Sequence, residues 1–122
     1  MDLIENFGIE TIESRHGYIE ITMPVTDKVK QPFGFLHGGA TIALAETAAS
    51  MGAHYASSED EIPLGLEINA NHIKSTRSGT VRAIGQALHI GSTTQVWDVK
   101  VTNEQDELIS VIRATIAIKK KR

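Results

Sequence analysis

The stretch GFLHGGATIALAETAASMGAHYA, residues 34–56, decides the fold of this chain. It is the longest apolar segment, and most of its residues are small or unbranched and favour a helix. Because apolar residues occur all around its circumference, we expect a helix from about His37 to about Ala56 that is covered on several sides. Glu46 is the one charged residue between Ala40 and Ala53. A carboxylate among apolar neighbours must find a partner or take part in chemistry.

The segments before this helix predict a hairpin and a loop. Residues 9–13 and 18–23 alternate apolar and polar side chains around a polar turn that ends in Gly17, which is typical of two paired strands. Met1–Phe7 predicts a short leading helix or turn that closes one end of the core. Residues 24–34 contain two prolines and predict a loop that leads into the helix.

The segments after the helix predict an antiparallel sheet. Four strands are expected at residues 64–76, 81–89, 94–102 and 108–118, with polar turns between them, and this order is typical of a meander. Trp97, Val99 and Val101 should share one buried face. The whole chain, residues 1–122, is then a single α+β domain in which an antiparallel sheet wraps around one long central helix.

Composition excludes several classes of protein. The 12 basic and 15 acidic residues give a net charge of −3, which disfavours nucleic acid as a partner, and the basic end at residues 119–122 predicts a solvated tail. Without cysteine there can be no disulfide framework and no thiolate zinc site, and the five histidines lack the spacing of metal ligands, so no metal is expected. The first residues do not resemble a signal peptide. Glu46 argues against a membrane span, and we expect a cytoplasmic protein.

Residues 31–40, QPFGFLHGGA, followed by Glu46 eight positions after Gly38, resemble the hot-dog-fold acyl-CoA thioesterases, and the similarity covers nearly the whole chain. The branch it resembles most has a catalytic glutamate on the central helix and includes 4-hydroxybenzoyl-CoA, PaaI-like and 1,4-dihydroxy-2-naphthoyl-CoA thioesterases. Residues 65–72, GLEINANH, and 88–97, LHIGSTTQVW, look most like the naphthoyl-CoA members, which act in menaquinone biosynthesis.

The resemblance implies a role for five residues in catalysis. The Gly38 amide and the Gln31 side chain would polarise the thioester carbonyl, and the free N–H groups at a helix start suit an oxygen that becomes an oxyanion. Glu46 would attack the carbonyl carbon or activate water as a general base. Ser50 lies one turn after Glu46 and could hold the attacking water. His37 would shape the carbonyl site or bind substrate, and capping or packing is an equal alternative.

The resemblance also implies residues that bind the substrate. Because aromatic residues are few, an aryl pocket would rely on Phe33 or Tyr55, together with aliphatic side chains and Met51. The residues expected near the pantetheine and phosphates of CoA are Lys74, His89, Gly91, Ser92 and Thr93. Arg77 is a further candidate that no motif supports.

The spacing along the helix predicts active sites shared between subunits. Gly38 and Glu46 are eight residues apart, which places them roughly 12 Å apart along a helix axis, too far for one carbonyl to touch both. We therefore expect a homodimer in which each site takes one group from each chain, and the resemblance implies a dimer of dimers. The predicted reaction converts an acyl- or aroyl-CoA to free acid and CoA without a cofactor. The alternatives are a non-enzymatic acyl-CoA-binding protein and an enoyl-CoA hydratase or dehydratase.

Overall fold

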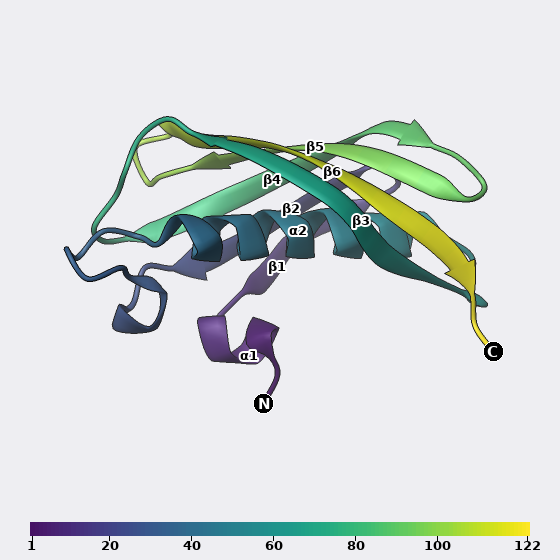
Figure 1. The fold of residues 1–122 in the computed structure, drawn as a ribbon, viewed down its shortest axis with the longest axis horizontal. Helices are drawn as coiled ribbons and strands as arrows, with labels where there is room; N and C mark the ends of the chain where they lie inside the picture. The colour runs from purple at the N-terminus through teal and green to yellow at the C-terminus, as the bar shows by residue number, and fades with distance from the viewer.

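One long helix lies against the concave face of a six-stranded antiparallel sheet in the computed structural model, which describes residues 1–122 (Figure 1). The predicted α+β wrap around a central helix is confirmed. The elements are α1 (Leu3–Phe7), β1 (Glu10–Arg15), β2 (Tyr18–Pro24), the 3-10 helix η1 (Asp27–Val29), α2 (Gly38–Tyr55), β3 (Glu61–His72), β4 (Thr80–Ile90), β5 (Thr94–Thr102) and β6 (Leu108–Lys120). No helix is both long enough and apolar enough to span a membrane.

The central helix begins and ends within one residue of its predicted bounds. His37 is the N-cap, with extended backbone angles, and its Nδ1 accepts a hydrogen bond from the Gly39 N–H at 2.8 Å. A side-chain acceptor at this position satisfies one of the amides that a helix start leaves unpaired. At the other end the Ala56 N–H donates to the Gly52 carbonyl at 3.1 Å. The polar residues that follow continue into the loop before β3.

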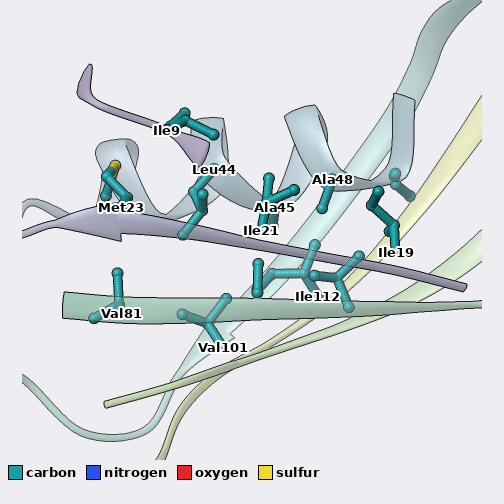
Figure 2. Packing of buried hydrophobic residues seen from close by; sticks show 14 of the residues in the cluster. Ile9, Ile19, Ile21, Met23, Leu44, Ala45, Ala48, Val81, Val101 and Ile112 are labelled. Atoms are coloured by element: carbon teal, nitrogen blue, oxygen red, sulfur yellow. The ribbon is translucent and has the colours of Figure 1, made fainter. Parts of the chain in front are cut away.

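The core lies between α2 and the sheet, and Figure 2 shows side chains from the helix and from several strands meeting there. On β2, Ile19, Ile21 and Met23 are at most 1% exposed, so the predicted two-residue alternation points one face of the hairpin at the helix. Trp97, Val99 and Val101 of β5 are fully buried on the same side, as predicted. The helix meets them with small residues, chiefly Ala45, Ala48, Ala49 and Ala53.

The small residues of α2 let the helix approach the sheet closely. A Cβ atom built on Gly52 would lie 2.6 Å from Cη2 of Trp97, so the indole occupies the space that any larger side chain would need. Trp97 is held there because its Nε1 donates to the buried Gln95 side chain at 2.8 Å. A buried indole N–H needs such a partner. Gly52 and Trp97 therefore set the distance between the helix and the sheet.

The predicted meander is wrong for its first strand, β3, which does not pair with the next strand, β4. The strand order is β1-β2-β4-β5-β6-β3, so β3 pairs with β6 at one edge, and β4 pairs with β2 and β5. The predicted strand at residues 64–76 instead spans Glu61–His72, and residues 73–79 form an irregular crossing segment. This segment is held near the start of α2, because the Leu36 N–H donates to the Thr76 carbonyl and the Val25 N–H donates to the Gly79 carbonyl, both at 2.8 Å. It is long enough to carry the chain across the sheet.

The expectation that α2 is covered on several sides is also wrong within one chain. The sheet covers the face that contains Leu44, Ala45 and Ala48, whereas Glu46 and His54 are exposed and Ala43, Thr47 and Ser50 are half-buried. One sheet can cover only one side of a helix. The second face has few charges, and α1, the η1 segment and β1 only border it.

The leading helix α1 is present, but it closes the core only through Phe7. Phe7 packs against the core, while Leu3 and Ile4 are 46% and 36% exposed. Gly8 ends the helix with φ +71°, a conformation that glycine adopts without strain.

Candidate active site

A cavity of about 350 Å³ lies at the start of α2, where the loop before the helix meets the ends of β3 and β6. The side chains that surround it come from parts of the chain far apart in sequence. It is lined by Gln31, Phe35, Leu36, Gly38, Thr41, His72, Ile73, Lys74, Ser75, Thr76, Ile109 and Ser110. The structure thus brings Gln31, Gly38 and Lys74 together, as the sequence analysis expects for the first two. We call this space the carbonyl cavity.

Gly38 contributes an unpaired backbone N–H to the carbonyl cavity. His37 accepts a hydrogen bond from Gly39, and the Ala40 and Thr41 N–H groups both donate to the His37 carbonyl at 3.0 and 3.1 Å. The Gly38 N–H has no acceptor among the protein's hydrogen bonds. An unpaired N–H at the positive end of a helix dipole is suited to an anionic oxygen. His37 therefore acts as the helix cap, one of its two predicted roles.

Gln31 contributes a side-chain donor. Its Oε1 accepts hydrogen bonds from the Phe33 N–H at 2.6 Å and the Phe35 N–H at 3.2 Å. The loop therefore holds the amide in one orientation, with the oxygen occupied and the Nε2 hydrogens available. With the Gly38 N–H, this gives the cavity two neutral donors.

His72 is a member of the carbonyl cavity that the sequence analysis did not select. Its Nε2 lies 2.9 Å from the position of a Cβ built on Gly38, so only glycine leaves room for the ring there. Its Nδ1 is hydrogen-bonded at 2.7 Å to Oγ of Ser110, which is 2% exposed. His72 and Ser110 face each other in the β3–β6 register. Only the strand order, which local sequence patterns did not reveal, could have identified this pair.

Lys74 and Arg77 have partners within the chain. Lys74 forms an ion pair with Glu107, and the hydrogen bond from Lys74 lowers the pKa of the Glu107 carboxyl. Arg77 lies over the Phe35 ring, 4.0 Å from its centroid. Lys74 lines the carbonyl cavity, so a phosphate reached by Lys74 would have to compete with Glu107 for the ammonium group.

Glu46, Ser50 and Met51 line a second cavity, of about 300 Å³, on the open face of α2. The remaining lining residues are Leu3, Ile4, Ala43 and Thr47. Glu46 is exposed and has no hydrogen bond or ion pair, so the expected loss of hydration does not occur within one chain. Its Oε2 lies 2.5 Å from the position of a Cβ built on Gly65, so the carboxylate rests on the bare backbone of β3. We call this space the Glu46 cavity.

The other predicted binding residues do not line either cavity. Phe33 is 78% exposed in the loop before α2. His89, Gly91, Ser92 and Thr93 form the turn between β4 and β5, at the end of the sheet far from the start of α2 (Figure 1). The His89 ring packs over Gly91, where a built Cβ would lie 2.6 Å from Nε2. One chain therefore does not bring this turn to the carbonyl cavity.

Each chain thus has two separate groups of polar atoms that differ in their chemistry. The carbonyl cavity offers two hydrogen-bond donors for an oxygen, and the Glu46 cavity offers an unpaired carboxylate beside the Ser50 hydroxyl. The hydroxyl of Thr47 is occupied, because it donates to the Ala43 carbonyl at 2.7 Å, whereas the hydroxyl of Ser50 has no partner. The two groups lie at different points along α2.

Comparisons with known proteins agree on one family. A model of the thioesterase superfamily matches residues 33–110. A 1,4-dihydroxy-2-naphthoyl-CoA hydrolase from Listeria monocytogenes serotype 1/2a (strain 10403S) is 51% identical over 122 residues, covering 100% of this chain and 99% of the relative. The hydrolase of the same name from Escherichia coli (strain K12) is 42% identical over 114 residues, covering 93% of this chain and 79% of the relative.

Solved structures show the same architecture. A glutamine-to-alanine mutant of a thioesterase enzyme from Staphylococcus aureus subsp. aureus Mu50 has a TM-score of 0.94 at 51% identity, covering 96% of this chain and 98% of that chain. A glutamate-to-alanine mutant of a Staphylococcus aureus protein has a TM-score of 0.95 at 51% identity, covering 98% and 99%. A thioesterase from Haemophilus influenzae has a TM-score of 0.92 at 38% identity, covering 96% and 82%.

Proposed function

This chain belongs to the thioesterase superfamily and has its hot-dog fold, and we propose that it hydrolyses an acyl- or aroyl-CoA thioester to the free acid and CoA. The observation that carries the proposal is the pair of donors in the carbonyl cavity. The Gly38 N–H is unpaired, the Gln31 amide is held by its oxygen, and both residues line the same cavity, so we assign both as donors to one carbonyl oxygen. Such donors stabilise the negative charge that develops on the oxygen during acyl transfer.

We assign the attacking group to Glu46 of a second subunit. Two routes fit this assignment. In the first, a Glu46 oxygen bonds to the carbonyl carbon, the C–S bond breaks, CoA leaves as the thiolate, and water then hydrolyses the mixed anhydride. In the second, Ser50 holds a water molecule, Glu46 takes a proton from it, and the water oxygen bonds to the carbonyl carbon. The C–S bond then breaks, and the CoA thiolate leaves and takes up the proton from Glu46. Incorporation of ¹⁸O from solvent into the Glu46 carboxylate during turnover would identify the first route, because general-base catalysis adds no solvent oxygen to that carboxylate.

Three features of the single chain support a homodimer with shared sites. Strand β3 pairs only with β6, so its other edge is free, and Leu64 and Leu66 on it are 48% and 61% exposed. A long apolar edge strand is a template for pairing with another chain. The open face of α2 beside it is largely uncharged. A two-fold axis that sets two such helices antiparallel would bring Glu46 of one subunit toward Gly38 of the other.

We propose a 1,4-dihydroxy-2-naphthoyl-CoA-type substrate, and hence a place in menaquinone biosynthesis. Two relatives at 51% and 42% identity have that substrate in their names. The solved relatives with a glutamate or a glutamine replaced by alanine carry changes at the same residue types as Glu46 and Gln31. Another relative, at 38% identity, is named as a proofreading thioesterase. The proposal includes a cytoplasmic location, a dimer of dimers, and hydrolysis without a metal or cofactor.

The experiment that tests the reaction measures release of free CoA thiol from naphthoyl-, benzoyl-, phenylacetyl- and straight-chain CoA thioesters. We expect wild-type turnover, and we expect Glu46→Ala to lower kcat at least 100-fold, since a positioned acid–base group contributes about 10²- to 10⁴-fold. Glu59→Ala, an exposed carboxylate in the loop after α2, is the matched control and should behave as wild type.

The same assay separates the competing functions. Binding of thioesters without thiol release would favour a non-enzymatic acyl-CoA-binding protein. Loss of the double bond of an enoyl-CoA, with the thioester intact, would favour a hydratase. Full activity of Glu46→Ala would remove Glu46 from the proposed mechanism.

A further inference from the structure

The short helix α1 lies beside the open face of α2, on the side away from the sheet (Figure 1). Leu3 and Ile4 of α1 line the Glu46 cavity, opposite Ala43, Glu46 and Ser50 of α2. Leu3 also lines a neighbouring cavity of about 390 Å³, together with His37, Gly39 and Ala43. The hollow formed by the Glu46 cavity therefore has Leu3 and Ile4 on its α1 side, and it shares Leu3 and Ala43 with the neighbouring cavity.

The walls of this hollow suit an apolar group attached to a thioester. Leu3, Ile4, Ala43 and Met51 present carbon and sulfur atoms, and Thr47 turns its hydroxyl to its own helix backbone. Apolar walls with a few polar groups are typical of small-molecule sites. The polar groups here are Glu46 and Ser50, which the proposed reaction places at the carbonyl carbon. An acyl group bonded to that carbon would lie against the apolar wall.

Local hydrogen bonds define both ends of α1, and one side chain anchors it to the core. Oδ1 of Asp2 accepts the Glu5 N–H at 2.9 Å and caps the helix. At the other end, the Gly8 N–H donates to the Glu5 carbonyl at 3.2 Å, and the Ile9 N–H donates to the Ile4 carbonyl at 3.0 Å. Phe7 anchors the helix in the core. These contacts hold Leu3 and Ile4 in place, yet both side chains remain more than a third exposed.

We infer that α1 forms one wall of the acyl pocket, and that Leu3 and Ile4 determine which acyl groups the enzyme accepts. This inference rests on the proposed thioester hydrolysis and adds a residue-level basis for its specificity. Burying apolar side chains against a ligand favours substrates whose acyl group reaches them, so aromatic acyl groups gain from this wall and an acetyl group does not. The N-terminal segment would then be part of the substrate site.

The test compares Leu3→Ala and Ile4→Ala with Asn6→Ala, which changes an exposed α1 residue that lines neither cavity. We expect kcat/KM for naphthoyl-CoA to fall about tenfold in the first two variants, with kcat/KM for acetyl-CoA unchanged. Leu3→Trp should fill the hollow and reject naphthoyl-CoA while it keeps acetyl-CoA. Asn6→Ala should match wild type with both substrates. If Leu3→Ala and Ile4→Ala keep the wild-type ratio of naphthoyl to acetyl turnover, the inference is wrong and thioester hydrolysis stands.

A binding measurement separates this inference from the proposed reaction. In phenacyl-CoA a methylene separates sulfur from the carbonyl, so it has no thioester to cleave. Titration calorimetry should show about tenfold weaker binding to Leu3→Ala than to Asn6→Ala, whether or not the wild type hydrolyses any thioester. Equal affinity for all variants would overturn the assignment of α1 to the pocket. Weaker binding together with no hydrolysis by the wild type would support the pocket and overturn the reaction.

Discussion

At the start of α2, the hydrogen bonds made by His37 leave the backbone N–H of Gly38 as an unpaired donor. The His37 side chain accepts a hydrogen bond from the Gly39 N–H, and the His37 carbonyl accepts from the N–H groups of Ala40 and Thr41. The Gly38 N–H therefore has no partner. His72 lies where a side chain at position 38 would be, so Gly38 is required by contact as well as by the proposed chemistry. A helix start with a side-chain cap can therefore present one donor at a defined point.

Ser110 is predicted to act on catalysis only through His72. Its Oγ is buried and hydrogen-bonded to Nδ1 of His72, so Ser110→Ala should release the ring without changing the rest of the cavity. We expect Ser110→Ala to lower kcat/KM about threefold to tenfold. This is the change that corresponds to the loss of one hydrogen bond worth about 1 kcal/mol. His72→Ala should cost at least as much, and the double variant should be no worse than His72→Ala. Steady-state kinetics of the four proteins measures this, and additive losses would contradict it.

At the scale of elements, the sequence predicts what depends on neighbours along the chain. The helix bounds, the leading hairpin and the buried face of β5 follow from caps, turns and alternation, and the structure confirms each. The sequence does not predict the place of β3, because a polar segment containing Ser78 and Gly79 is compatible with either a tight turn or a crossing. Pairing between β3 and β6 depends on contacts between residues that are 38 (His72 and Ser110) to 59 (Glu61 and Lys120) positions apart, which no local pattern encodes.

Gly52 is predicted to be the position on α2 least tolerant of a larger residue. In Gly52→Ala the new methyl carbon would lie 2.6 Å from the Trp97 ring, and Trp97 is fully buried and tied to Gln95, so the ring cannot turn away. We expect a loss of about 1–3 kcal/mol in the free energy of unfolding, despite the better helix propensity of alanine. Thr47→Ala, on the open face of the same helix, should change it by less than about 0.5 kcal/mol. Urea denaturation distinguishes the two, and a neutral Gly52→Ala would contradict the packing argument.

The contact between the loop before β3 and the end of β6 predicts a pH dependence of stability. Hydrogen bonds from Ser58 and then Lys120 lower the pKa of Asp60 from its ordinary 3.8, and the bond to Asp60 raises the pKa of Lys120 from 10.5. The contribution of Asp60 to the free energy of unfolding is therefore fully present above pH 3.8, and it is lost as the pH falls through the lower pKa that Asp60 has in the folded protein. The contribution of Lys120 to the free energy of unfolding is fully present below pH 10.5, and it is lost as the pH rises through the higher pKa that Lys120 has in the folded protein.

We therefore expect the urea midpoint of the wild type to fall at both extremes, and the fall above pH 10.5 to be shallower in Lys120→Met, which lacks the titrating amine. Lys119→Met, which removes a neighbouring exposed ammonium group without an ion pair, is the control. Identical alkaline profiles for the two variants would show that the Asp60–Lys120 bond does not stabilise the fold. The effect should be small because both side chains are well exposed.

At the scale of the whole molecule, some residues of the proposed site can be predicted from a sequence motif and others cannot. Gln31, Gly38 and Glu46 were identified from a motif, because they lie within sixteen residues of one another in sequence. His72, Ser110 and the α1 wall could not be identified in this way, because strand order and chain crossing bring them to α2. The sequence also does not predict that Glu46 is exposed in the single chain, because the proposed surroundings of Glu46 depend on a second chain.

The shared-site dimer predicts that two inactive variants restore each other. In Gln31→Ala the subunit keeps Glu46, and in Glu46→Ala it keeps Gln31. A mixed dimer therefore has one site with both groups and one with neither. Refolding an equal mixture should give about a quarter of wild-type activity, because half of the dimers are mixed and each has one intact site of two. A mixture of Glu46→Ala with Glu46→Gln is the control and should stay inactive. If native mass spectrometry shows mixed dimers while the first mixture also stays inactive, each site must draw both groups from one chain, and the helices cannot be paired as proposed.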